Sequence, residues 1–271
     1  MFRVLRTRIQ QGQRTLGYPA EAPALPDRFR GRPLLDASRC RDACSACVAA
    51  CPTDALSVAE GAPGMGEAPR GTPHLDLGRC LFCGECEAAC PGGALSFGSD
   101  HRMATRTRED LVTSDGTLRL AEALAEHARR IFGRSLRLRQ VSAGGCNACE
   151  ADVNVLTTVV FDLSRFGIQF VASPRHADGL LVTGALSRNM ELAVRKTWEA
   201  VPEPKLVIAV GACAISGGPY VDHPEVLNGI GSMLPVDLYV PGCPPHPVTI
   251  LDGLLRLLGQ LESHAQEGAR D

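Results

Sequence analysis

Twelve cysteines are the residues of this 271-residue chain whose type and spacing most directly suggest chemistry. They form two tight runs and one dispersed set: Cys40, Cys44, Cys47 and Cys51; Cys80, Cys83, Cys86 and Cys90; and Cys146, Cys149, Cys213 and Cys243. The first residues contain no apolar segment typical of a secretory signal, so we expect reduced thiols rather than six disulfides. Clustered thiols in that setting are typically metal ligands or catalytic groups.

The two runs have the spacing of iron–sulfur ligands. The second run is C-x2-C-x2-C-x3-C-P, the ferredoxin pattern in which three cysteines hold one [4Fe-4S] cluster and the fourth ligates another. The first run has one more residue in its first gap. This pattern predicts a first site of Cys40, Cys44, Cys47 and Cys90 and a second site of Cys80, Cys83, Cys86 and Cys51. Two zinc sites are the alternative, but zinc motifs lack the third close cysteine and the trailing proline.

The two runs are also an internal repeat. The segment CVAACPTDALSV at 47–58 aligns with CEAACPGGALSF at 86–97. Each half is expected to supply a loop, a short helical turn and a strand-like tail, Ala55–Val58 or Ala94–Phe97. The stretch between the halves, 59–74, is rich in Gly and Pro and predicts a surface loop.

The dispersed cysteines lie where a parallel sheet would bring them together. Cys146 and Cys149 stand on a glycine-rich turn that leads into a helical pattern, and Cys213 and Cys243 come just after strand-like runs. Strands alternating with helices predict a parallel sheet that is covered on both faces, with its functional loops at the carboxyl ends of the strands. We therefore expect a third [4Fe-4S] site from Cys146, Cys149, Cys213 and Cys243. A set of buried structural thiols is the alternative.

The predicted fold class is α/β, with an N-terminal two-cluster ferredoxin-like module followed by a flavodoxin-like parallel-sheet domain. The expected organisation is an N-terminal docking arm (1–35), a ferredoxin domain (36–100), a linker with a connecting helix (101–135), the parallel-sheet domain (136–262) and a tail (263–271). The connecting helix is expected within TLRLAEALAEHARRIFG, 117–133, where apolar residues recur at helical spacing.

Longer motifs resemble known families. The segments GGCNACEADVN, SPRHADGLLVTGALS, PKLVIAVGACAISGG and LPVDLYVPGCPPHP resemble the B subunits of NADH:quinone oxidoreductase (complex I) and the small subunits of energy-converting [NiFe] hydrogenases. Upstream, YPAEAPALPDRFRGRPLLD and the cysteine runs resemble the iron–sulfur subunit of formate hydrogenlyase and the I subunit of complex I. The chain thus resembles a fusion of two subunits. Its Cys146-x2-Cys149 spacing matches the hydrogenase branch, because complex I B subunits generally have adjacent cysteines there.

The resemblance implies an electron-transfer subunit with three [4Fe-4S] clusters in a membrane-associated [NiFe] hydrogenase of the formate hydrogenlyase type. The implied partners are a [NiFe] large subunit or a complex I D-subunit-like chain, membrane-arm subunits, and a donor such as ferredoxin, formate dehydrogenase or CO dehydrogenase. The catalytic metal is expected on a partner chain, and the complex at the inner face of the cell membrane. The alternatives are a complex I-like quinone-reducing subunit and a non-catalytic redox-sensing relative.

A few other residues invite a functional interpretation. Glu150 is a candidate proton relay, or else a carboxylate stabilised by the positive end of a helix. Gly144, Gly145, Gly211 and Gly242 are expected to let the backbone approach the third cluster. The basic, mildly amphipathic stretch FRVLRTRIQQGQRT is either a docking segment for a membrane or subunit, or a solvated arm.

Composition and motifs exclude several classes. With 45% hydrophobic and 21% charged residues, the chain has the composition of a globular protein rather than a disordered one. Its net charge of −2 argues against non-specific binding to nucleic acid. The sequence has neither a P-loop nor a Rossmann fingerprint, so we expect neither NAD nor flavin in this chain.

Overall fold

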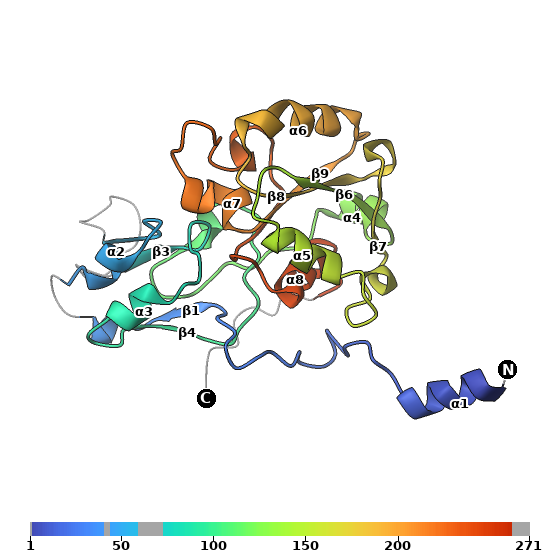
Figure 1. Cartoon of the computed structure of the whole chain (residues 1–271), viewed down its shortest axis with the longest axis horizontal. Helices are drawn as coiled ribbons and strands as arrows, with labels where there is room; N and C mark the ends of the chain where they lie inside the picture. The colour runs from blue at the N-terminus through green and yellow to red at the C-terminus, as the bar shows by residue number, and fades with distance from the viewer. Residues whose placement is uncertain (1, 41–43, 59–72, 262–271) are drawn as a thin grey trace.

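The structure is a computed structural model that describes residues 2–40, 44–58 and 73–261. The predicted tail, 263–271, and most of the predicted surface loop at 59–74 lie outside these residues. Figure 1 shows two parts, which we call the small module (β1 to β5 with α2 and α3) and the large module (β6 to β10 with the helices around them). A separate N-terminal helix, α1 (Phe2–Gln11), extends away from both.

The large module is built on a five-stranded sheet in which every pairing is parallel. The strand order is β10-β9-β8-β6-β7. The strands are β6 (Leu136–Ser142), β7 (Ile168–Phe170), β8 (Gly179–Thr183), β9 (Leu206–Val210) and β10 (Leu238–Val240). All residues of β8 and β9 are buried, as expected for central parallel strands that are covered on both faces. The predicted parallel-sheet class is thus confirmed.

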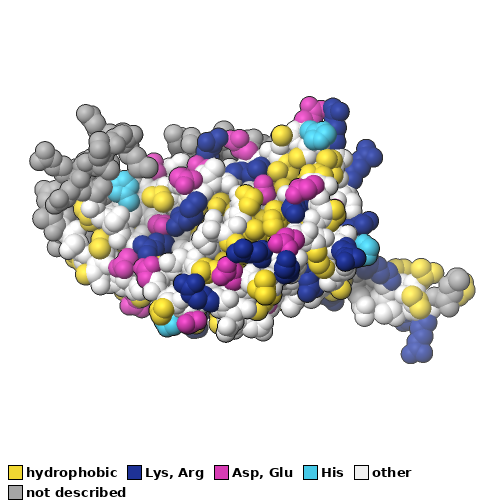
Figure 2. Space-filling view, turned by 90° about the horizontal axis from the view of Figure 1, so that it is seen from above, with side chains coloured by type: hydrophobic (Ala, Val, Ile, Leu, Met, Phe, Trp, Pro, Cys, Tyr) yellow, Lys and Arg dark blue, Asp and Glu magenta, His cyan; other side chains and the backbone are white. Residues whose placement is uncertain are grey.

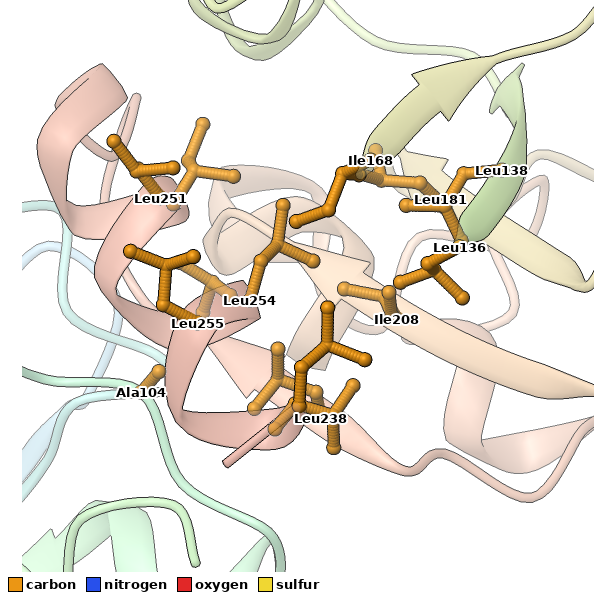
Figure 3. Packing of buried hydrophobic residues seen from close by; sticks show 14 of the residues in the cluster. Ala104, Leu136, Leu138, Ile168, Leu181, Ile208, Leu238, Leu251, Leu254 and Leu255 are labelled. Carbon is orange, nitrogen blue, oxygen red and sulfur yellow. The ribbon is translucent and has the colours of Figure 1, made fainter. Parts of the chain in front are cut away.

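Helices cover both faces of this sheet. They are α4 (Glu126–Phe132), α5 (Ala148–Val155), α6 (Arg188–Ala200), α7 (Ala212–Ser216) and α8 (Pro247–Leu257). Because side chains alternate along a strand, Leu181 and Ile208 pack in one cluster with α8, whereas Val182 and Val207 pack in the other. Figure 3 shows Leu254 of α8 on the side of the helix that faces the sheet residues Ile208 and Leu238, and Leu251 and Leu255 belong to the same buried cluster.

The small module contains two short antiparallel sheets and two helices that carry cysteines. Strand β1 (Pro33–Leu35) pairs with β4 (Leu95–Phe97), and β3 (Pro73–Asp76) pairs with both β2 (Leu56–Val58) and β5 (Val112–Thr113). The predicted strand-like tails of the repeat are therefore β2 and β4. Helices α2 (Ala46–Ala50) and α3 (Glu85–Ala89) pack against each other at equivalent places in the repeat. Short 3-10 helices occur in both modules, at Ala37–Arg39, Glu109–Leu111, Leu163–Phe166, Pro174–His176, Gly218–Tyr220 and Ile230–Ser232.

The predicted connecting helix is shorter than expected. Helix α4 covers only Glu126–Phe132, and residues 117–125 are not helical. In this stretch the amide of Ala121 donates to the carbonyl of Ala104 at 2.7 Å, and the amide of Leu124 donates to the carbonyl of Leu257 at 2.9 Å. The apolar side chains at 118, 121 and 124 are buried in this non-helical form. Tertiary packing therefore overrides the helical spacing.

Residues 15–32 of the predicted docking arm, which we call the strap, pack on this chain itself. The amide of Leu16 donates to the carbonyl of Val160 at 2.8 Å, and the ring of Tyr18 is buried in the core of the large module. The strap then leads into β1, which belongs to the small module. No helix among the described residues is both long and apolar enough to cross a bilayer.

Candidate metal centres

The cysteines of the first site surround one cavity. Cys40, Cys44, Cys47 and Cys90 line it together with apolar side chains that include Leu35, Pro73 and Leu95. Cys47 lies on α2, and Cys90 reaches the same cavity from the end of α3 in the other half of the repeat. The structure thus brings together the four cysteines that the crossed pattern of the runs assigns to the first site.

The cysteines of the second site surround a matching cavity. Cys51, Cys80, Cys83 and Cys86 line it with Leu56, Leu75 and Phe97. Each half of the repeat also contains an equivalent hydrogen bond from a backbone amide to a cysteine sulfur. The amide of Ala55 donates to Cys51 Sγ at 3.2 Å, and the amide of Ala94 donates to Cys90 Sγ at 3.2 Å. Amides that point at sulfur stabilise thiolate ligands and tune the clusters they bind.

The cysteines of the third site come from distant parts of the large module. Cys146 and Cys149 stand where β6 leads into α5, Cys213 lies in α7 after β9, and Cys243 follows β10. Burial is the main cause that raises the pKa of Cys149. The other three thiols of this set also raise it, so they lie close to Cys149. Cys146 and Cys243 are exposed.

Two glycines make room for the sulfurs of this third site. A Cβ on Gly211 would lie 2.5 Å from Cys149 Sγ, and one on Gly218 would lie 2.8 Å from Cys213 Sγ. Both glycines have positive φ, which favours glycine. Of the four glycines that we expected near the third cluster, Gly211 alone would place a Cβ first against a cysteine sulfur. A Cβ on Gly144, Gly145 or Gly242 would first meet Ser187, Gly184 or Pro245. Sequence reasoning missed Gly218, although it stands in a Gly-Gly pair shortly after Cys213.

Burial controls the protonation of these thiols. It raises the pKa of Cys80 to about 12 and the pKa values of Cys86 and Cys213 to about 11. Without a nearby cation these cysteines are therefore neutral thiols at pH 7. A bound metal stabilises the thiolate form, so the donor sets suit a metal centre that displaces the protons.

The donor sets of the first two sites match the ligands that a four-iron cluster needs. A [4Fe-4S] cube takes one thiolate at each of its irons, so its ligands surround a cavity rather than meet at one atom. The first two sites have that form. Four cysteines, an apolar lining and amides directed at sulfur are the groups that such a cube requires.

The second and third sites are neighbours. Burial and Cys146 are the larger causes that raise the pKa of Cys243, and Cys83 of the second site also contributes. The two modules are joined nearby, because Ser216 Oγ at the end of α7 donates to the carbonyl of Gly78 at 2.9 Å. The second site is thus the site of the small module that approaches the third.

Glu150 lies beside the third site in a buried hydrogen-bonded position. Its Oε1 accepts hydrogen bonds from Ser142 Oγ at 2.6 Å and from Thr183 Oγ1 at 2.7 Å. Burial favours the neutral acid and by itself would raise the pKa of Glu150. The hydrogen bonds from the two hydroxyls favour the carboxylate and outweigh burial, so the pKa is lowered. The carboxylate thus ties α5 to β6 and β8. Its role as a proton relay stays a prediction, and the two hydroxyl partners carry no local signal in the sequence.

Comparisons with known proteins match both modules. Residues 146–257 match the family model "NADH ubiquinone oxidoreductase, 20 Kd subunit", and residues 39–94 match "4Fe-4S dicluster domain". Formate hydrogenlyase subunit 7 of Escherichia coli is 46% identical over 48% of this chain, which spans only about half (51%) of that relative. The probable membrane-bound hydrogenase subunit mbhJ of Pyrococcus furiosus is 40% identical over 53% of this chain and 85% of its own length.

A third relative and a solved structure complete the comparison. The B subunit of NADH-quinone oxidoreductase from Heliobacterium modesticaldum is 40% identical over 47% of this chain and 74% of its own length. A chain of the membrane-bound sulfane sulfur reductase, an archaeal respiratory membrane complex, matches 51% of this chain and 76% of its own length with 32% identity and a TM-score of 0.44. The chain therefore belongs to the family of the NADH ubiquinone oxidoreductase 20 kDa subunit, and it carries a 4Fe-4S dicluster domain ahead of that region.

Proposed function

We propose that this chain is an electron-transfer subunit that binds three [4Fe-4S] clusters in a membrane-associated, energy-converting [NiFe] hydrogenase of the formate hydrogenlyase type. The observation that carries the proposal is the grouping of the twelve cysteines into three sets of four, with the segments of the second and third sets joined by the hydrogen bond from Ser216 to Gly78. The relatives are named as subunits of formate hydrogenlyase, a membrane-bound hydrogenase and NADH-quinone oxidoreductase, which are oxidoreductase complexes.

The chain's own residues would place and tune the clusters. Each cluster, when bound, supplies one-electron redox chemistry at a potential set by its surroundings. Leu56, Leu75 and Phe97 exclude water from the second site, and the amide of Phe82 donates to Cys80 Sγ at 3.3 Å. These groups act on the stability of the charged thiolates and therefore on the potential.

The third site would face a partner. Cys146 and Cys243 are exposed, so this chain alone does not shield a cluster there from water. We infer that the large subunit covers this face and holds the catalytic metal, with Glu150 as a candidate proton relay toward it. We expect the first site to be the one farthest from this partner and to receive electrons from a donor such as ferredoxin, formate dehydrogenase or CO dehydrogenase.

Helix α1 would contribute to membrane association. All its described residues are exposed, including Phe2 at 88% and Ile9 at 80%. Phe2, Leu5 and Ile9 share one side of the helix by their spacing, and Arg6 and Arg8 stand beside it. Figure 2 shows this helix projecting from the body with its apolar and basic side chains uncovered. Such a helix suits an anionic membrane surface, which supports a location at the inner face of the cell membrane beside membrane-arm subunits.

Metal analysis of the purified complex tests the proposal. Three four-iron cubes give about twelve iron atoms per chain, and a hydrogenase partner adds nickel and H2 evolution from reduced viologen. Zinc, or clearly fewer irons, would contradict the assignment of ligands. An active complex without nickel would instead favour the complex I-like, quinone-reducing alternative, which the similarity to an NADH-quinone oxidoreductase chain supports. An intact complex with neither nickel nor redox activity would favour a redox-sensing relative.

A further inference from the structure

The strap is anchored on both modules. At its start, Thr15 Oγ1 donates to the carbonyl of Val159 at 2.9 Å, and the Tyr18 hydroxyl donates to Asp252 Oδ1 at 2.7 Å. Both acceptors belong to the large module. At its end, the amide of Gly31 donates at 2.8 Å to the carbonyl of Gly98, just beyond β4 of the small module. The segment between these anchors therefore crosses from one module to the other.

Phe29, within this crossing segment, contacts the loop of the third site. The rings of Phe29 and His246 pack edge to face, with centroids 5.5 Å apart and an interplanar angle of 74°. His246 stands in the loop that connects Cys243 to α8, and its Nδ1 accepts a hydrogen bond of 3.2 Å from the amide of Val248. An aromatic pair of this geometry stabilises a contact beyond the area that it buries. Phe29 is thus fixed against the start of α8.

Arg30, the next residue, contacts the loop of the second site. Its Nη1 donates to the carbonyl of Phe82 at 3.3 Å. Its guanidinium also lies over Gly84, where an added Cβ would come within 3.1 Å of Arg30 Cζ. Phe82 and Gly84 are the two neighbours of Cys83, so Arg30 holds the backbone on both sides of this cysteine.

We propose that Phe29 and Arg30 are positioning residues that fix the separation of the Cys83 loop from the Cys243 loop. Two residues that share a peptide bond cannot move apart, so the loops that they contact are held together. The consequence for electron transfer rests on the function proposed above, because electron tunnelling between clusters slows steeply as their separation grows. The contact itself requires no cluster. Sites that must keep a defined geometry depend on supporting residues of this kind.

Hydrogen–deuterium exchange of the full chain, purified with its clusters, tests this proposal. In F29A/R30A we expect peptides that cover 79–84 and 246–252 to exchange about three- to tenfold faster than in the wild type, because the Cys83 loop and the start of α8, whose amides bond to His246, lose their shared support. Arg28→Ala is the matched control. It removes the same charge from an exposed neighbour for which the described residues show no hydrogen bond or ion pair. Unchanged exchange in both peptides of the double variant would overturn the proposal.

Two additional measurements keep the test decisive. If the double variant does not fold, Phe29→Leu and Arg30→Lys, which retain the apolar character and the charge, are expected to accelerate exchange in the 246–252 and 79–84 peptides, respectively. The magnetic interaction between the second and third clusters in the EPR spectrum of the reduced chain should weaken in F29A/R30A and persist in R28A. Absence of any cluster signal in the wild type would count against the proposed function, while the exchange result still decides the role of the strap.

Discussion

The hydroxyl of Ser216 donates a hydrogen bond of 2.9 Å to the backbone carbonyl of Gly78. Ser216 ends the helix that carries Cys213, and Gly78 stands shortly before Cys80, so this bond joins the third site to the second. A Cβ on Gly78 would lie 2.8 Å from Ile215, which shows how closely the modules approach at this point. The two modules are thus packed together where their cysteines meet.

Replacement of Ser216 by alanine is expected to lower the free energy of unfolding by about 1 kcal/mol, because it leaves the carbonyl of Gly78 without this partner. Thermal or chemical denaturation of the full chain measures the change. Ser99→Ala, at an exposed serine, is the control and should stay within about 0.5 kcal/mol of the wild type. Equal effects of the two substitutions would show that the bond between the modules contributes nothing.

Replacement of Leu254 by alanine is expected to destabilise the chain by about 2 to 5 kcal/mol. This side chain is fully buried on α8 and packs toward the sheet, so its removal leaves a cavity (Figure 3). Leu192 on α6 is 66% exposed, and the same substitution there should change the free energy of unfolding by less than about 0.5 kcal/mol. Comparable losses at both positions in urea denaturation would contradict the described core.

Replacement of Gly211 by alanine is expected to remove the third cluster alone. The added Cβ would lie 2.5 Å from Cys149 Sγ, and the positive φ of Gly211 disfavours any other residue. Iron should fall from about twelve to about eight atoms per chain, because each cube contains four irons. Gly231→Ala is the control, since a Cβ there meets only the Tyr239 hydroxyl at 3.6 Å. A full complement of iron in G211A would refute the placement of the third site.

The stability of the chain should depend on the protonation of His101. Burial is the main cause that lowers the pKa of His101 below its usual 6.5. The unfolded chain therefore binds this proton more readily, so the free energy of unfolding falls as the pH drops from 6.5 through the lower folded pKa. In H101Q this part of the pH dependence should disappear, as measured by urea denaturation between about pH 7 and 5. H127Q, at an exposed histidine of α4, is the control and should keep the wild-type dependence of stability on pH. Loss of this pH dependence in H127Q but not in H101Q would show that His101 is not its source.

Helix α1 should bind anionic vesicles through its apolar side. I9E introduces a carboxylate beside Phe2 and Leu5 and is expected to abolish co-sedimentation with vesicles rich in anionic lipid. V4E adds the same charge away from that side, by the spacing of an α-helix, and should retain most of the binding. Added salt should weaken the wild-type interaction, because the arginines contribute electrostatically. Equal binding to uncharged vesicles would argue against recognition of anionic headgroups.

The local spacing of the cysteines was enough to predict the ferredoxin-like module, because a cluster-binding loop needs only neighbouring residues. The parallel sheet was also predictable, since strand-like runs precede Cys213 and Cys243, and the run at β9 is continuously apolar. The interior strand β6 was missed, because Arg137 and Arg139 alternate with its buried leucines and interrupt the apolar run. The assignment of individual cysteines to three clusters stays a prediction, although the structure places each predicted set together.

Interactions between distant segments could not be predicted from the sequence. The residues around Phe29 and Arg30 in the sequence do not indicate that Phe29 contacts His246 or that Arg30 contacts Phe82. Both partners are distant in the sequence, His246 in the large module and Phe82 in the small module. Likewise, the apolar spacing at 118, 121 and 124 suggested a helix, but these side chains enter the core from a non-helical segment whose amides bond to distant carbonyls. Such outcomes depend on the assembled core rather than on local preference.

The hydrogen bond from Tyr18 to Asp252 has a consequence for the order in which the protein is made. The strap leaves the ribosome before the first cysteine run, but its acceptor lies on α8, which follows every strand of both modules in the chain. The hydrogen bond from Tyr18 to Asp252 therefore cannot form until the strands of both modules have been translated. Until then the cysteine loops of the small module lack their neighbours in the large module.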